Sequence, residues 1–200
     1  MGAAADCELI RAGFLGQPVN AITSLGFVLG GVVVASRRQN RRWVGIALAA
    51  TGVGSFLFHG PMPPGNEWAH DVTIAWLLVV VAAAGTRAES YSHLPALAVL
   101  GVGFALAPAW GDPIAVALTV VAIVSVLRSR DRHALLPLSL LALVAIYGRL
   151  GATGGPFCDP ESVFQPHGVW HLGSALAVTW WALSDVSRPR ADSPSPAPSR

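Results

Sequence analysis

The sequence has no lysine, only two cysteines and few charged residues of either sign. All 13 basic side chains are arginine and the formal net charge is only +2, which does not indicate a nucleic-acid-binding surface. Two cysteines are too few for the disulfide framework that holds small secreted domains together. Charged residues make up 12% of the chain, against roughly 25% in soluble domains. This shortage of charge argues against an ordinary soluble domain and indicates a membrane protein.

What the sequence has instead is a series of long apolar runs, separated by short breaks rich in charge, glycine or proline. Apolar residues make up 53% of the 200 residues, and each run is close to the ~20 residues that a helix needs to cross a membrane. The runs lack the polar alternation of outer-membrane β-barrel strands. We therefore predict an all-α bundle of seven transmembrane helices, over residues 19–36, 43–60, 68–86, 93–109, 112–128, 134–150 and 166–184.

The break between the fourth and fifth runs is short, with proline and glycine in residues 108–113. A re-entrant pair of half-helices is the alternative interpretation of these two runs. The N-terminus has Asp6 and Glu8 rather than a basic region, so we do not expect a removed signal peptide. Residues 188–200 are rich in proline, serine and alanine, which is typical of disorder. We therefore expect one membrane domain over residues 1–187, followed by a disordered cytoplasmic tail.

The arginines between the runs predict the orientation of the helices. Those that follow the first, third, fifth and seventh runs are Arg37, Arg38, Arg41, Arg42, Arg87, Arg128, Arg130, Arg132, Arg188 and Arg190. The opposite side of the membrane would have only Arg11 and Arg149. Because basic loops stay in the cytoplasm, the N-terminus is predicted outside and the C-terminus inside. This orientation requires an odd number of spans, so the helix count and the charges agree.

Polar residues within or beside membrane helices are costly and therefore informative, and in this sequence they cluster. The second run ends at His59, one turn after Ser55, and the third run begins near Asp71. The seventh run begins with His167 and His171. The predicted topology places all these residues at the extracytoplasmic face, where they could form one site.

His167 and His171 are four residues apart, so on a helix they share a face, one turn apart. With His59 as the third ligand they would form a three-histidine zinc site with an open fourth position, which is the pattern of catalytic zinc. Zinc lowers the pKa of its bound water and polarises a carbonyl group. Asp71 could then accept a proton, and Ser55 could donate a hydrogen bond to the developing oxyanion. These residues favour hydrolysis of an amide or ester in a lipid-like substrate.

Each of these residues also has a plainer interpretation. A pair of histidines in an apolar helix can form interhelical hydrogen bonds, and a serine such as Ser55 often packs between membrane helices. Asp71 could stabilise the positive end of its own helix, and His70 is an alternative metal ligand. His93 and His133 are predicted to lie at the cytoplasmic interface. The metal site therefore depends on whether the histidines converge in space.

Four segments of the sequence resemble the alkaline ceramidases. They are Cys7-Glu8, Pro18-Val19-Asn20, the stretch from Gly54 to His59 together with Asp71, and the stretch from His167 to His171. The resemblance covers nearly the whole membrane part in order and spacing. The serine, aspartate and histidine set is typical of a wider superfamily of seven-helix membrane hydrolases, which includes the adiponectin receptors and the GPI-anchor remodelling enzymes. The Cys-Glu opening points to the ceramidase branch.

The resemblance implies a seven-helix bundle in which zinc is held by His59, His167 and His171. Ser55 and Asp71 would take the oxyanion and proton-transfer roles. The implied activity is hydrolysis of the ceramide amide to a sphingoid base and a fatty acid.

The sequence departs from this pattern in two places. Family members can hold a calcium ion near the N-terminus, and the corresponding ligands here would be Asp6, Glu8 and Gln17. Gln17 stands where an acid is expected, and because lost charge weakens a site of oxygen ligands, calcium is not favoured. The loop between His59 and Asp71 is slightly longer than in the family, which leaves the placement of Asp71 open.

The two cysteines, Cys7 and Cys158, are both predicted outside, where disulfides persist. A bridge between them would tie the N-terminal segment to the loop before the seventh run, whereas two free buried thiols are the alternative. Both cysteines correspond to positions that can be disulfide-linked in the resembling family.

Three functions follow as hypotheses. The leading one is a zinc-dependent membrane amidase that takes its lipid substrate from the bilayer, in a bacterial inner membrane with the active site towards the extracytoplasmic face. Because many bacteria lack ceramide, another lipid amide or ester is an alternative substrate. The second is a lipid-binding or receptor-like protein of the same superfamily with little turnover. The third, a haem-binding electron carrier, is disfavoured because His167 and His171 lie one turn apart on one helix.

Overall fold

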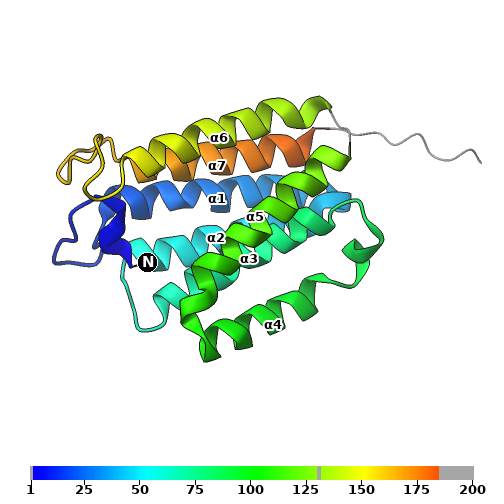
Figure 1. The fold of residues 1–200 in the computed structure, drawn as a ribbon, viewed down its shortest axis with the longest axis horizontal. Helices are drawn as coiled ribbons and strands as arrows, with labels where there is room; N and C mark the ends of the chain where they lie inside the picture. The colour runs from blue at the N-terminus through cyan, green and yellow to red at the C-terminus, as the bar shows by residue number, and fades with distance from the viewer. Residues whose placement is uncertain (1, 130–131, 185–200) are drawn as a thin grey trace, which may run out of the picture.

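The described part of the chain forms seven α-helices, and most of them run back and forth along a common direction (Figure 1). The computed structural model describes residues 2–129 and 132–184, and no β-strand occurs within them. The helices are α1 (Pro18–Arg37), α2 (Arg42–His59), α3 (Asn66–Ala83), α4 (His93–Leu106), α5 (Gly111–Arg128), α6 (Leu135–Leu150) and α7 (Pro166–Leu183). Short 3-10 turns accompany them: η1 (Ala3–Asp6), η2 (Gln39–Arg41), η3 (Arg87–Ser90), η4 (Pro108–Trp110) and η5 (Arg132–Ala134).

Each predicted run corresponds to one of these helices, and no helix end differs from its prediction by more than three residues. The all-α class is therefore confirmed. The fourth and fifth runs form two separate helices, α4 and α5, joined by η4. The predicted disordered tail, residues 188–200, and the cytoplasmic arginine Arg130 lie outside the described residues.

The helices form a layer around α1, which packs between α2 and α7 (Figure 1). α6 packs against α7, α3 packs against α2, and both α4 and α5 pack against α3. α5 and α6 follow each other in the chain, yet they pack on different partners, α5 on α3 and α6 on α7. Of the helices that carry the predicted site residues, α2 and α7 pack against α1, and α3 packs against α2.

α1 and α2 approach until their backbones touch at two glycines. A Cβ on Gly31 would lie 2.5 Å from the backbone oxygen of Gly45, and a Cβ on Gly45 would lie 2.6 Å from that of Gly31. Small residues permit this close approach of membrane helices. The contact fixes His59 on α2 relative to Asn20 and Ser24 on α1.

The ends of the helices next to the site are set by proline and glycine. Pro18 and Pro166 begin α1 and α7. Proline suits the first position of a helix, because the backbone N–H there would have no partner within the helix. Gly65, just before α3, has a φ of +84°, a left-handed conformation that glycine adopts without strain. The starts of α1, α3 and α7 thus come together at the end of α2.

An apolar core fills the bundle beyond this end. Phe27, Val34, Leu48, Trp76 and Val80 belong to one buried cluster that joins α1, α2 and α3. The Phe27 ring also contacts the His171 ring edge-on, with 5.8 Å between the ring centroids. The predicted site therefore lies at the edge of the core.

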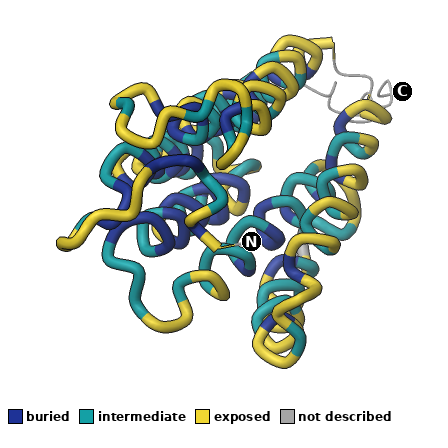
Figure 2. Tube along the Cα trace, turned by 60° about the vertical axis from the view of Figure 1, so that its left-hand side comes forward, coloured by how far each residue is buried: buried dark blue, intermediate teal, exposed yellow. Residues whose placement is uncertain are grey.

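The outer surface of the bundle is strongly apolar, and exposed positions follow the outer sides of the helices (Figure 2). Large side chains such as Leu29, Val99, Leu143 and Leu176 are more than half exposed. Among the described residues, three helical stretches are long and apolar enough to cross a membrane: Pro18–Arg37, Pro108–Arg128 and Arg132–Leu150. An apolar surface of this extent is rare on soluble monomers, so these features together indicate membrane association.

Candidate metal centre

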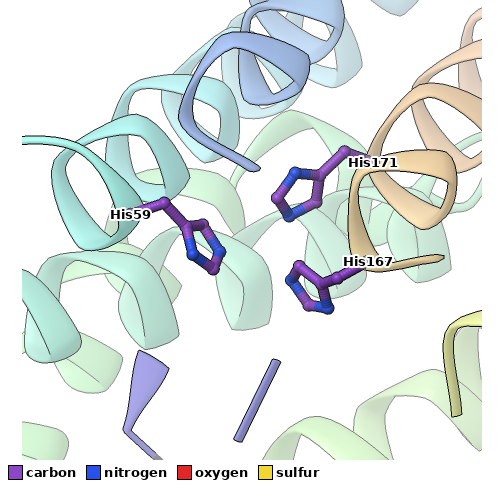
Figure 3. A group of neighbouring side chains, drawn as sticks. All are labelled: His59, His167 and His171. Carbon is purple, nitrogen blue, oxygen red and sulfur yellow. The ribbon is translucent and has the colours of Figure 1, made fainter. Parts of the chain in front are cut away.

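Three histidines from two helices face one another at one end of the bundle (Figure 3). His59 is the last residue of α2, and His167 and His171 lie in the first two turns of α7. One ring nitrogen from each lies within 4.8 Å of those of the other two, so the group could hold a metal ion. Nitrogen ligands of a tetrahedral zinc lie about 3.4 Å apart, from Zn–N bonds of 2.0–2.1 Å. Small rotations of the rings would close the difference.

The Nδ1 atoms of two of these histidines have hydrogen-bond acceptors behind them. His59 Nδ1 lies 2.6 Å from Oε1 of Gln17, and His171 Nδ1 lies 3.1 Å from the backbone oxygen of Asn20. An acceptor at Nδ1 fixes the proton there and leaves Nε2 with its lone pair, which is how metal-binding histidines are usually held. These two rings are therefore oriented to bind through Nε2.

His59 Nε2 provides the test of whether a metal fits. His59 is fully buried, and its Nε2 atom has no hydrogen-bond partner. A buried polar atom without a partner is costly, and in this case it faces two further imidazoles. A metal ion held by His59, His167 and His171 would satisfy the atom, so the residues fit such an ion.

His167 has a carboxylate at its Nδ1 atom. Asp6 Oδ1 lies 3.3 Å away, and both side chains are about one-fifth exposed. Burial raises the pKa of the Asp6 carboxyl to about 6, and the nearby His70 acts in the opposite direction. The sequence interpretation assigned Asp6 to a calcium site and missed this contact, because nothing in the order of residues places Asp6 beside α7.

Ser55 lies at the site, as predicted. It is buried, and its Oγ lies 3.3 Å from Nε2 of His171 and 2.8 Å from Oγ of Ser24. Ser24 and Thr23 also lie within 3.3 Å of Nδ1 of His171 through their hydroxyl oxygens. Ser55 is therefore within reach of a group bound at the three histidines.

A polar stripe on α1 completes the surroundings; the sequence suggested Gln17 as a calcium ligand and Asn20 as part of the family resemblance, but it did not predict their bonds with the histidines. Gln17, Asn20 and Ser24 are spaced three and four residues apart, so they share one face of an otherwise apolar helix. Asn20 is fully buried, and neither its Oδ1 nor its Nδ2 has a protein partner. The spacing of these residues is the signal that could have identified them.

Asp71 is close to the site but makes its contacts elsewhere. Its Oδ1 lies 3.0 Å from Nδ1 of His70, and its Oδ2 lies 2.6 Å from where a Cβ on Gly111 would be. The carboxylate thus lies between α3 and the start of α5, beside a cavity of about 440 Å³. No described contact joins Asp71 to the three histidines, and its proton-transfer role stays a prediction.

His70 is the residue between Asp71 and the histidines. Its ring stacks on Phe58, with centroids 4.4 Å apart, and its centroid is 6.3 Å from that of His59. It is not one of the three residues whose nitrogens converge. The structure thus brings together His59, His167 and His171 rather than a set that includes His70.

The three candidate calcium ligands, Asp6, Glu8 and Gln17, each bind a different part of the chain. Glu8 accepts hydrogen bonds of 2.8 Å from the backbone N–H groups of Val19 and Asn20, so it caps the start of α1. Gln17 Nε2 donates to the backbone oxygens of Ala3 and Glu8 at 2.8 and 2.7 Å. These contacts bind the N-terminal segment to α1 and the histidines, and a calcium site there stays untested.

Cys7 and Cys158 form a disulfide, with 5.6 Å between their Cα atoms, which confirms the predicted pairing. Thr153 strengthens the same connection, because its Oγ1 accepts from the N–H of Cys7 and donates to the oxygen of Ala4. The N-terminal segment and the loop before α7 accordingly lie at the same end of the bundle (Figure 1).

His93, predicted to lie at the cytoplasmic interface, is the first residue of α4 and is buried, with its ring centroid 5.3 Å from that of Trp43. Its position relative to a membrane stays a prediction. Its backbone oxygen accepts a hydrogen bond of 2.9 Å from Nε1 of Trp76. The tryptophans cover the histidine because α4 starts against α2 and α3, a contact that helix periodicity alone does not predict.

A second cavity, of about 90 Å³, lies between α3, α5, α6 and α7. Leu77, Ile123, Leu141 and Trp181 contribute to its lining, which is apolar except for Thr119. Because Trp181 is ten residues beyond His171 on α7, this lining reaches about 15 Å along the helix axis from the histidines.

No protein-family model, no curated protein and no solved structure matches this chain. What the chain does must therefore be inferred from the chemistry of its own residues.

Proposed function

We propose that the protein is a zinc-dependent membrane amidase, which hydrolyses the amide of ceramide or of a related lipid to a sphingoid base and a fatty acid. The observation that carries the proposal is the group of three converging histidines with the Ser55 hydroxyl 3.3 Å from Nε2 of His171. The resemblance of these residues to those of the alkaline ceramidases supports the choice of substrate. Three neutral nitrogen ligands suit zinc, and a three-ligand site leaves a position for water or substrate.

The reaction divides between the metal and the side chains of the chain. Zinc, when bound, supplies a Lewis acid and a water molecule of lowered pKa. Ser55 would donate a hydrogen bond to the oxygen of the reacting carbonyl, where negative charge develops. Asn20, with both polar atoms of its amide buried and unpartnered, offers a donor and an acceptor to the polar part of the lipid.

Asp71 is the proposed proton acceptor. Its carboxylate would have to turn from His70 and Gly111 towards the histidines when substrate binds. Catalytic contacts are often long in the absence of substrate, so the present distances are compatible with this role. Its hydrogen bond to His70 also connects the carboxylate with a ring whose centroid is 6.3 Å from that of His59.

The lipid would enter from the bilayer rather than from water. The N-terminal segment covers the polar end of the site through its bonds with Thr153 and the Cys7–Cys158 disulfide. The apolar cavity between α3, α5, α6 and α7 lies deeper in the bundle, and α5 and α6 make no extensive contact with each other. An acyl chain could therefore pass between these two helices.

The arginine distribution supports a seven-span topology in a bacterial inner membrane, with the N-terminus outside. In that orientation the three histidines, Cys7 and Cys158 lie towards the extracytoplasmic side, where a disulfide is chemically stable.

The proposal is tested with purified protein in detergent. Wild type should contain about one zinc per chain, as expected for one three-histidine site, and should release fatty acid from a lipid amide. His171→Ala should lose both properties, whereas the exposed His133→Ala should keep both. If wild type holds zinc yet cleaves no amide or ester in a broad lipid panel, the proposed enzymatic function is refuted.

A receptor-like or lipid-binding function is the second candidate, and the position of Asp71 favours it. With its carboxylate on His70 and α5 rather than at the histidines, the site would hold zinc and lipid with little turnover. This function predicts zinc binding and lipid binding that both survive Ser55→Ala and Asp71→Asn, with no product released by wild type.

A further inference from the structure

The N-terminal segment carries a contact that the proposed reaction does not use. Asp6 Oδ1 lies 3.3 Å from Nδ1 of His167. The acceptors behind the other two histidines are Gln17, the N-cap residue of α1, and Asn20 in its first turn. At His167 the group facing Nδ1 comes instead from the N-terminal segment, where Asp6 is the last residue of η1.

Asp6 is held in place by bonds to a distant part of the chain. Cys7, the next residue, has a φ of +70°, a conformation that persists in a non-glycine residue only where its surroundings hold it. Cys7 is linked to Cys158, and its N–H donates to Oγ1 of Thr153 at 3.0 Å. The backbone N–H of Thr153 donates in turn to the oxygen of Ala5 at 3.0 Å.

We propose that Asp6 is a positioning residue that orients His167 for the metal, and that the Cys7–Cys158 disulfide sets metal affinity by holding Asp6 in reach. This inference rests on the proposed zinc site and adds to it a means of control. A carboxylate at Nδ1 fixes the tautomer and the direction of the ring and makes Nε2 a better ligand. Without the disulfide, the turn at Cys7 would relax, and Asp6 would leave the ring.

The consequence is that metal retention depends on the oxidation state of two cysteines that contact no metal. In the disulfide form, Asp6 and His167 stay paired and zinc is held. With the two cysteines unlinked, the other two histidines keep their acceptors Gln17 and Asn20, so zinc binding weakens rather than disappears. The site would therefore hold zinc more tightly in an oxidising compartment, where the disulfide persists, than in a reducing one.

The test measures the zinc dissociation constant of the full chain in detergent, by competition with a chelator of known affinity. Asp6→Asn should weaken zinc binding by ~10–100-fold, the usual effect of removing such a partner. Cys7→Ser/Cys158→Ser should weaken it as well. Because both changes act on one contact, adding Asp6→Asn to the serine variant should cause little further loss. Glu161→Gln, an exposed carboxylate in the loop beside Cys158, is the matched control and should bind zinc like wild type.

Thermal unfolding of the zinc-free proteins separates positioning from folding. A purely structural Asp6 would lower the midpoint of the zinc-free form and leave the dissociation constant unchanged, and that result overturns the proposal. If the losses from Asp6→Asn and from the serine pair simply multiply, the disulfide does not act through Asp6, and that half of the proposal is overturned. If wild type and Asp6→Asn bind zinc equally tightly, only this inference is refuted. If wild type binds no zinc, the proposed function is refuted as well.

Discussion

Two side chains of the same kind, Ser24 and Ser55, meet beside His171 with their oxygens 2.8 Å apart, but they have different positions relative to the metal site. Ser24 lies on the Nδ1 side of the His171 ring, and Ser55 lies on the Nε2 side. A metal bound at Nε2 would therefore place the reacting carbonyl near Ser55 rather than Ser24. This difference favours Ser55 over Ser24 for the proposed oxyanion role.

Ser55→Ala should lower kcat for amide hydrolysis by ~10²–10³-fold, the usual effect of removing an oxyanion donor. Zinc content should stay unchanged, because the hydroxyl is not needed to orient any of the three rings. Turnover of radiolabelled lipid amide and metal analysis of the same sample measure both. Ser36→Ala, an exposed serine of α1, is the control, and an unchanged kcat in Ser55→Ala would remove Ser55 from the mechanism.

Gln17 shows how one amide can do two different tasks. Its oxygen accepts from His59, and its nitrogen donates to the backbone oxygens of Ala3 and Glu8. Gln17→Glu keeps the acceptor for His59 but leaves two carbonyl oxygens facing a carboxylate. Each buried group left unpaired costs about 1–3 kcal/mol, so this variant should be less stable than wild type.

Chemical or thermal unfolding in detergent measures the loss caused by Gln17→Glu. The control is Gln39→Glu, the same substitution at an exposed position, which should leave the midpoint unchanged. Equal midpoints for the two variants would show that the two donated hydrogen bonds contribute nothing.

Among the elements, helices could be predicted well and loops poorly. The apolar runs predicted all seven helices, because a long apolar segment in a membrane can satisfy its backbone N–H and C=O groups by forming a helix. The partner of Asp6 and the direction of Asp71 could not be predicted in the same way. Asp6 reaches His167 only through bonds between residues about 150 positions apart, such as Cys7 with Cys158, and Asp71 follows the packing of α5 on α3.

The arrangement of the three histidines could be predicted in part. Helix spacing predicted that His167 and His171 share a face, and the topology placed His59 at the same end. Their convergence is confirmed, because each lies at the terminus of a helix that packs near α1. The acceptors on α1 were not predicted, although the spacing of Gln17, Asn20 and Ser24 contains the signal.

The contact between α1 and α2 leads to a prediction about helix packing. Gly31→Ala places a methyl group 2.5 Å from the backbone of α2, so the helices must separate, and overpacking of this kind costs about 1–3 kcal/mol. Gly103→Ala, on α4, meets nothing within 4 Å and should not destabilise the protein. Unfolding midpoints of the two variants make the comparison, and a stable Gly31→Ala would show that the contact is adjustable.

For the whole molecule, the proposed metal connects parts that have few other contacts. α2 and α7 both pack on α1 but touch each other little, so zinc at His59, His167 and His171 would join them directly. Zinc at 100 times its dissociation constant should add about 2.7 kcal/mol to the free energy of unfolding. Removal by a chelator should therefore lower the unfolding midpoint of wild type.

The matched variant is His59→Ala, which removes the α2 ligand. Its midpoint should be insensitive to the chelator, because the bridge between α2 and α7 is already broken. A chelator that lowers both midpoints equally would act elsewhere, and zinc would then not connect the two helices at this site.

The position of the histidine pair on α7 has a consequence for biosynthesis. α1 to α6 emerge from the ribosome first and contain Gln17, Asn20, Ser55 and His59, but a metal ion needs two more ligands that only α7 brings. The disulfide closes over 151 residues and includes the six earlier helices, yet it too waits for the segment just before α7. A chain interrupted before that point has neither covalent closure nor a complete set of ligands, so capture of the proposed metal would mark a chain whose seventh helix is in place.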